Sequence, residues 1–129
     1  MGDAKTSPIA AYDVARVVAT ILDNPAPHIG QIYNLTGPES VGVAQHARAF
    51  SEALGRTIRY RDVPVEPWTG KLREFGVPPH LASHLAVMAR LHAQGRYDRA
   101  TDDVFKLTGQ KPMSTGEFVS KHAAEFTRG

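Results

Sequence analysis

The segment Gln31–Thr36 (QIYNLT) most constrains what this chain can fold into. A short strand is predicted here, because Ile32, Tyr33 and Leu35 favour β-structure and a Gly-Pro turn follows. Apart from Asn34 and Thr36, the segment is nearly apolar on both faces, and strands of that kind normally lie inside a sheet that is covered on both sides. The chain therefore needs further strands, or it needs a partner that supplies them.

Few further strands are predicted. Thr57–Val63 alternates apolar and charged residues and is expected to form one half-exposed strand. Apolar residues recur at helical spacing in the rest of the chain. The predicted helices begin near Asp13, Gly42, Pro64, His80, Thr101 and Ser114. About six helices with two or three short strands indicate a helix-rich α/β or α+β fold.

Several helix ends carry specific signals. Asp13 and Thr101 are expected to be N-caps, since their side-chain oxygens can accept a hydrogen bond from the first turn. Ser114 is followed by Glu117 at the spacing of a capping box. Gly55 stands where a glycine commonly ends a helix.

Length and composition limit the classes of protein. The 129 residues suit one domain, 1–129. The 15 basic and 13 acidic residues are interspersed, which argues against a nucleic-acid partner. The absence of cysteine excludes disulfides and thiolate chemistry. No stretch is long and apolar enough to suggest a membrane span, and the first ten residues do not resemble a signal peptide, so a cytoplasmic location is expected.

Four segments of the chain carry a recognisable pattern. They are GDAKTSPIAAYDVARVVATIL, HIGQIYNLTGPESVGVAQHARAFSEALGRTIRYRDVP, GVPPHLASHL and TDDVFKLTGQKPMSTGEFVSKHAAEF. In order and spacing they resemble the C-terminal part of the NmrA-like group of atypical short-chain dehydrogenases/reductases, and they cover almost the whole chain. The resemblance implies the substrate-side region of a Rossmann protein whose full-length relatives use NAD(P).

Two features typical of such enzymes are missing from this sequence. The glycine-rich dinucleotide fingerprint is absent, and the turn at Gly37-Pro38 has one glycine where three are needed. The Tyr-x-x-x-Lys pair is also absent, since the similar spacing at Tyr12 ends in Arg16. We therefore expect no catalytic, cofactor-binding or metal-binding residue in this chain, and no NAD(P) binding by the chain alone.

The position of Met1 within the family pattern leaves two explanations open. It directly precedes Gly2-Asp3, which already match the pattern. The sequence is therefore expected to be either a naturally short reading frame or one fragment of a longer chain.

Three polar motifs are candidates for chemistry, and each has a simpler structural interpretation. The turn Thr36–Glu39 could line a pocket, but a strand-to-helix connector is favoured. His80 and His84 have zinc-ligand spacing without a nearby third ligand, so ordinary surface histidines are expected. Asp102 and Asp103 lie at a predicted helix start, where their charge suits the helix dipole.

Four large side chains could form a ligand pocket. In the group that the chain resembles, the helices after the small strand help to wall the substrate pocket. The four side chains on these helices are Trp68, Phe75, Met88 and Tyr97. At helical spacing such residues are more often core, and both interpretations stay open, with a small apolar molecule as the expected ligand.

Two classes of function follow from the sequence. The first is a non-catalytic module that binds a small molecule or a protein and self-associates through Gln31–Thr36, because an unpaired strand edge favours pairing with another chain. The second is the substrate-side half of an NAD(P)-dependent oxidoreductase or of an NmrA-like redox-sensing regulator. That second function requires a separate Rossmann half as partner.

Overall fold

The computed structural model describes residues 2–127, so Met1 and residues 128–129 lie outside the described residues. Within that range the chain forms seven α-helices, one 3₁₀ helix and a two-stranded sheet. This composition confirms the helix-rich α/β class predicted from the sequence.

The secondary-structure elements follow one another in a simple order. Strand β1 (Lys5–Thr6) pairs antiparallel with β2 (Val41–Gly42). The helices are α1 (Ala11–Asp23), η1 (Ala26–His28, 3₁₀), α2 (Val43–Leu54), α3 (Val65–Glu74), α4 (Pro79–Ala93), α5 (Asp103–Thr108), α6 (Thr115–Lys121) and α7 (Ala123–Phe126).

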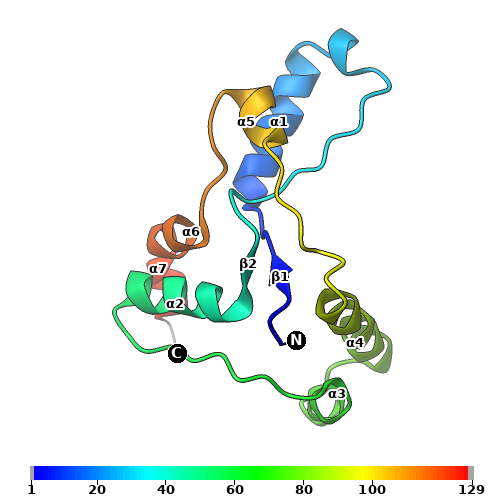
Figure 1. Cartoon of the computed structure of the whole chain (residues 1–129), viewed down its shortest axis with the longest axis vertical. Helices are drawn as coiled ribbons and strands as arrows, with labels where there is room; N and C mark the ends of the chain where they lie inside the picture. Colours follow the sequence, from blue (N-terminus) through cyan, green and yellow to red (C-terminus); the bar gives the residue numbers. More distant parts are fainter. Residues whose placement is uncertain (1, 128–129) are drawn as a thin grey trace.

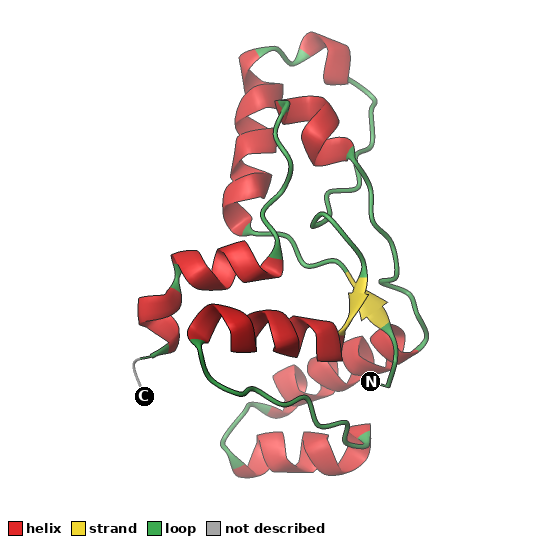
Figure 2. Cartoon of the chain, turned by 60° about the vertical axis from the view of Figure 1, so that its left-hand side comes forward, coloured by secondary structure: helices red, strands yellow, loops and turns green. Residues whose placement is uncertain are grey.

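The helices gather into three clusters. α1 packs against α5, α2 packs against α6 and α7, and α3 packs against α4. In Figure 1 the α1–α5 pair lies at the top, α2, α6 and α7 at the left, and α3 and α4 at the lower right, with the sheet between them. Figure 2 shows that long loops join the three clusters.

Both longer strands predicted from the sequence are wrong as strands of this chain. Gln31–Thr36 and Thr57–Val63 are irregular segments, and the only ladder among residues 2–127 joins β1 to β2. A strand requires a partner for its backbone groups, and no strand among residues 2–127 pairs with either segment. The short strand that the resemblance placed before the first helix is present as β1.

Helix ends were predicted with mixed success. The capping box at Ser114 is confirmed, with Glu117 N–H donating to the Ser114 hydroxyl at 3.2 Å and Ser114 N–H donating to the Glu117 carboxylate at 2.7 Å. Gly55 ends α2 with a left-handed φ of 62°. Asp13 and Thr101 are not N-caps, because α1 begins earlier, at Ala11, and the N-cap of α5 is the next residue, Asp102.

The core is small for a chain of this size. Among the described residues the buried apolar side chains are Val17, Ala82, Ala86, Ala89, Val104 and Val119. The accessible surface is 8859 Å² for a mass of 14.0 kDa. A compact monomer of that mass exposes about 6,700 Å², so roughly 2,200 Å² of additional surface faces solvent.

Candidate functional site

The turn after Gln31–Thr36 is filled by the chain's own backbone. Gly37 N–H donates to the Ser7 carbonyl at 3.1 Å, and a Cβ built on Gly37 would lie 2.2 Å from the Pro8 carbonyl oxygen. Glycine is therefore required here because the segment before α1 crosses directly over the turn. This agrees with the interpretation of the turn as a connector.

A dinucleotide does not fit at this turn. In a Rossmann fingerprint the glycines leave space for a pyrophosphate to approach the backbone. Here the space beside Gly37 is occupied by the Pro8 carbonyl, whose partial negative charge would also repel a phosphate. The residues of this turn therefore cannot hold NAD(P) in the manner of a Rossmann fingerprint.

The segment Gln31–Thr36 is anchored along one edge only. The N–H of Asn34 donates to the Asp103 carboxylate at 2.8 Å, and the Asn34 carbonyl accepts a hydrogen bond from the Thr101 hydroxyl. The N–H of Thr101 donates to the Thr36 hydroxyl at 2.9 Å. These contacts tie the segment to the loop before α5.

The opposite edge of the segment is open. In an extended chain successive residues direct their backbone groups to opposite sides, so those of Tyr33 and Leu35 lie away from the anchored edge. No residue in the range 2–127 makes a hydrogen bond to the backbone of Tyr33 or Leu35. The neighbouring Ile32 is 88% exposed. A groove of about 310 Å³ runs beside the segment, bounded by Thr6 and Ser7 of the β1 region and by Tyr97 and Arg99.

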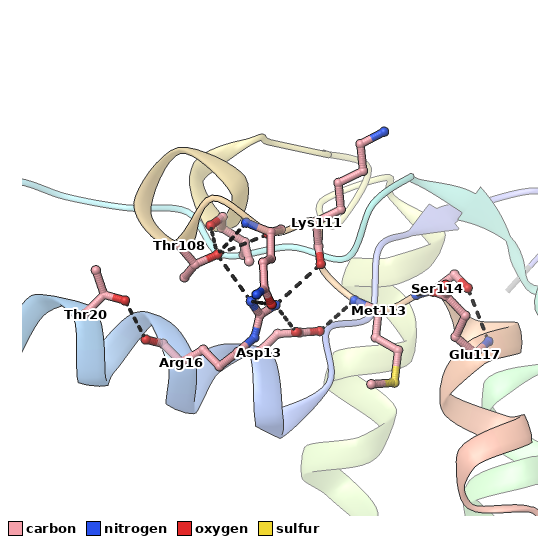
Figure 3. A network of polar contacts seen from close by, with 10 residues as sticks. Asp13, Arg16, Thr20, Thr108, Lys111, Met113, Ser114 and Glu117 are labelled. Atoms are coloured by element: carbon pink, nitrogen blue, oxygen red, sulfur yellow. Dashed lines mark hydrogen bonds and ion pairs between the residues drawn. The ribbon is translucent and has the colours of Figure 1, made fainter.

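A buried ion pair braces the start of α1 against the loop that follows α5. Asp13 accepts a hydrogen bond from Arg16 at 2.6 Å and another from Met113 N–H at 2.7 Å, as Figure 3 shows. Arg16 also donates to the Gln110 side chain at 2.8 Å. The two charged side chains are 2% and 17% exposed, so the pair is nearly dehydrated.

The sequence pointed to this brace only indirectly. Asp13 was taken for an N-cap and Arg16 for the wrong member of a catalytic pair. An Asp–Arg pair three residues apart on a helix is a recognised ion-pair spacing, and that signal could have found the contact. An open pocket of about 530 Å³ lies beside the brace, where Arg16 and Lys121 lie over the Tyr12 ring at 5.6 and 4.8 Å.

The four side chains predicted to form one pocket lie in three places. The Tyr97 hydroxyl contacts the Met88 sulfur at 3.2 Å, so the structure brings these two together. Trp68 lines a separate pocket of about 170 Å³ with Tyr60 and neighbouring residues. Phe75 is 84% exposed at the end of α3. Trp68 and Tyr97 line different pockets, and ligand binding by these four side chains stays a prediction.

The remaining polar candidates are exposed. His80 and His84 both lie on the solvent side of α4, and no group of three or more metal-ligating side chains occurs among residues 2–127. Asp102 forms an ion pair with Lys106 at 2.8 Å, and that hydrogen bond lowers the pKa of the Asp102 carboxyl. The Asp103 carboxylate accepts the hydrogen bond from Asn34 N–H described above, and its position in the sequence did not indicate this contact.

No helix among the described residues combines the length and the apolar character that crossing a bilayer requires.

Comparison with known proteins finds similarity to reductases and dehydrogenases. No family model matches the sequence. Over 126 residues it is 33% identical to an NAD(P)H azoreductase of Xenophilus azovorans, and over 128 residues it is 33% identical to a festuclavine dehydrogenase of Aspergillus fumigatus. Each match covers 98% of this chain and 44% of the relative. The chain thus spans less than half the length of these relatives.

Solved structures show the same fold. A nucleoside-diphosphate-sugar epimerase from Staphylococcus aureus superposes with a TM-score of 0.81 at 30% identity, over 92% of this chain and 41% of that one. An NADPH-dependent quinone oxidoreductase from Escherichia coli superposes with a TM-score of 0.85 at 24% identity, over 95% and 43%. The chain is thus related in sequence and fold to NAD(P)-dependent reductases, as the NmrA-like resemblance indicated, and it is consistent with their C-terminal region.

Proposed function

We propose that the chain is the substrate-side region of an NAD(P)H-dependent reductase, and that it acts together with a nucleotide-binding sheet held on separate residues. The observation that carries this proposal is the match of 98% of the chain to 44% of an NAD(P)H azoreductase. The misfit of a dinucleotide at the Gly37 turn is in keeping with a cofactor bound elsewhere.

The open edge supplies the means of joining such a sheet. Tyr33 and Leu35 present backbone donors and acceptors along one side, while Thr101 and Asp103 fix the other side. An added strand would pair with the open side without displacing any contact of the described residues. Side chains that are now exposed, Ile32 above all, would then lie on a sheet face.

The exposed area fits the same proposal. An obligate interface buries about 2,000–5,000 Å² in total, or about 1,000–2,500 Å² on each partner. The additional surface of roughly 2,200 Å² on this chain falls within that range. Exposed apolar side chains on and beside α1 contribute to it, among them Leu22 at 72% and Ile29 at 79%.

A second candidate function uses the same edge. Two copies of the chain could pair through Gln31–Thr36 and form a non-catalytic module, because an edge that accepts one strand accepts another of suitable sequence. The free backbone of Tyr33 and Leu35 favours this candidate as much as it favours the first.

A chimeric enzyme tests the proposal. The 126 matching residues of the Xenophilus azovorans azoreductase are replaced by this chain, and NAD(P)H oxidation with an azo substrate is measured. We expect activity in the chimera and its loss in Leu35→Pro, since proline removes a donor from the open edge. Arg59→Pro, in the other irregular segment, is the matched control and is expected to retain activity.

Two further measurements separate the outcomes. NADPH binding to the chimera, followed by fluorescence, establishes that its nucleotide-binding part is folded. An inactive chimera that still binds NADPH would count against the reductase role. Analytical ultracentrifugation of the chain alone tests the second candidate: a dimer that Leu35→Pro dissociates supports it, whereas a monomer at all concentrations rules it out.

A further inference from the structure

An apolar pocket lies where the start of α1 meets α2 and α6. Its volume is about 310 Å³. The lining residues are Pro8, Ile9, Ala10, Ala11, His46, Phe50, Met113, Ser114, Thr115 and Phe118. It shares no residue with the groove beside Gln31–Thr36, and an inference from it does not rest on the proposed function.

No aspartate, glutamate, lysine or arginine side chain lines this pocket. The larger pocket beside the brace has Arg16, Lys111 and Glu117 in its wall, and the groove near Gln31–Thr36 has Arg99. A ligand in the uncharged pocket would therefore meet mainly methyl, methylene, thioether and aromatic groups.

His46 is fixed by the protein and directs no free polar atom at a ligand. Its Nε2 lies 3.4 Å from the Thr6 carbonyl, which can only accept, so Nε2 carries the proton. Its Nδ1 lies 2.9 Å from the Thr115 hydroxyl, which donates to it in the neutral tautomer. Both ring nitrogens are thus engaged by protein groups.

The other polar side chain of the lining is engaged as well. The Ser114 hydroxyl accepts the N–H of Glu117 at 3.2 Å as part of the capping box. Together with the bonded Thr115 hydroxyl, this gives each polar side chain of the lining a partner within the protein. A charged ligand would lose its hydration here without a compensating contact, which is costly.

The two phenylalanine rings of the lining pack against other rings of the protein. Phe50 makes an edge-to-face contact with Phe126 at 5.4 Å between ring centroids, and Phe118 packs on His122 at 4.6 Å. Rings that are fixed in this way offer preformed surfaces for stacking and edge contacts with another ring. The Met113 thioether adds a polarizable surface that also favours aromatic partners.

From these features we infer that the pocket between α1, α2 and α6 binds a small uncharged aromatic molecule of about two rings. Its volume lies at the lower end of the range of about 300–1,000 Å³ that is common for ligand sites, which favours a small molecule. The occupant is uncharged because no aspartate, glutamate, lysine or arginine side chain lines the wall to compensate a charge.

A matched pair of probes tests this inference on the chain itself. β-Naphthol and naphthalene sulfonate share the same two rings, and only the second carries a charge at neutral pH. Binding is followed by titration of the amide chemical shifts of the chain. We expect saturable binding of β-naphthol, with shifts at Ala11, Phe50 and Met113, and affinity for the sulfonate lower by roughly tenfold or more.

A pocket-filling variant completes the test. Ala11 lies at the exposed start of α1, so Ala11→Phe can place a ring in the pocket without entering the core. We expect it to reduce β-naphthol affinity by about tenfold or more. Ala93→Phe, at the exposed end of α4, is the control and should leave the affinity unchanged.

Three results would overturn the inference. They are the lack of saturable β-naphthol binding, equal affinity for the two probes, and unchanged affinity in a folded Ala11→Phe variant. Shifts confined to the surroundings of Trp68 would also overturn it and would place the ligand in the pocket that the sequence suggested.

Discussion

Replacing Asp13 with alanine should strongly lower the free energy of unfolding of the chain. The substitution leaves Arg16 without its carboxylate and the Met113 N–H without its acceptor. Removing one partner of a buried ion pair costs about 3–5 kcal/mol. Arg16 keeps its bond to Gln110 at 2.8 Å, so we expect the lower part of that range, about 3 kcal/mol. Asp13→Asn should cost less, because its amide oxygen can still accept from Met113.

Urea unfolding followed by circular dichroism measures this loss as a lower midpoint with an unchanged slope. Asp23→Ala is the control, since Asp23 is exposed at the end of α1 and should change stability by less than about 0.5 kcal/mol. The reasoning also requires that Asp13→Ala and Arg16→Ala be strongly non-additive in a double-mutant cycle. An Asp13→Ala variant within about 0.5 kcal/mol of the parent would refute the brace.

Three other predictions follow from single contacts. Gly37→Ala should lower the free energy of unfolding by about 1–3 kcal/mol, because its Cβ would meet the Pro8 carbonyl at 2.2 Å. Gly70→Ala in α3 is the control, since its Cβ would meet nothing within 4 Å and alanine favours a helix, so it should stabilise the chain. Thermal unfolding of the two variants measures both changes. Partial burial and the hydrogen bond to Asp62 raise the pKa of Tyr60 to about 12, so its ionisation should appear as a late phase in an absorbance titration. Because the raised pKa belongs to the folded state, the contribution of neutral Tyr60 to the free energy of unfolding is present below pH 10 and is lost as the pH rises towards 12. Tyr60→Phe should remove the late phase of the absorbance titration. Isothermal titration of the chain alone with NADPH should give no stoichiometric binding, and a saturable isotherm would contradict the misfit at Gly37.

Local signals predicted the helices well because helix ends are determined by nearby residues. The capping box at Ser114, the glycine end at Gly55 and the Gly42 start of α2, where Gln45 accepts the Gly42 N–H at 3.1 Å, were all visible in the sequence. The role of Asp13 could not be predicted from local signals, because its partner Met113 lies 100 residues away in the sequence. A local pattern carries no information about so distant a contact.

Strands were predicted less well because a strand depends on its neighbour. Gln31–Thr36 has the composition of a strand, yet within the described residues its Asn34–Thr36 part is held by the loop before α5, and Gln31 and Tyr33 are held by His28, with no neighbouring strand. The pocket at Phe50 and Phe118 was missed for a similar reason. Its walls come from three segments that meet only through tertiary packing, while the predicted group around Trp68 relied on the family resemblance, in which the helices after the small strand help to wall the substrate pocket.

The pairing of helices also determines the order in which the chain can be completed during synthesis. α1 can pack against α5, and α2 against α6, only after the second helix of each pair has been synthesised. α3 and α4 are consecutive in the sequence and can pack against each other as soon as both have been made. Between the end of α2 at Leu54 and the end of α6 at Lys121 the ribosome adds about 70 residues, which takes roughly 3–14 s at ~5–20 residues per second. For those seconds the apolar face of α2 lacks the helix that packs against it in the folded structure, and the same holds for α1 until α5 has been added.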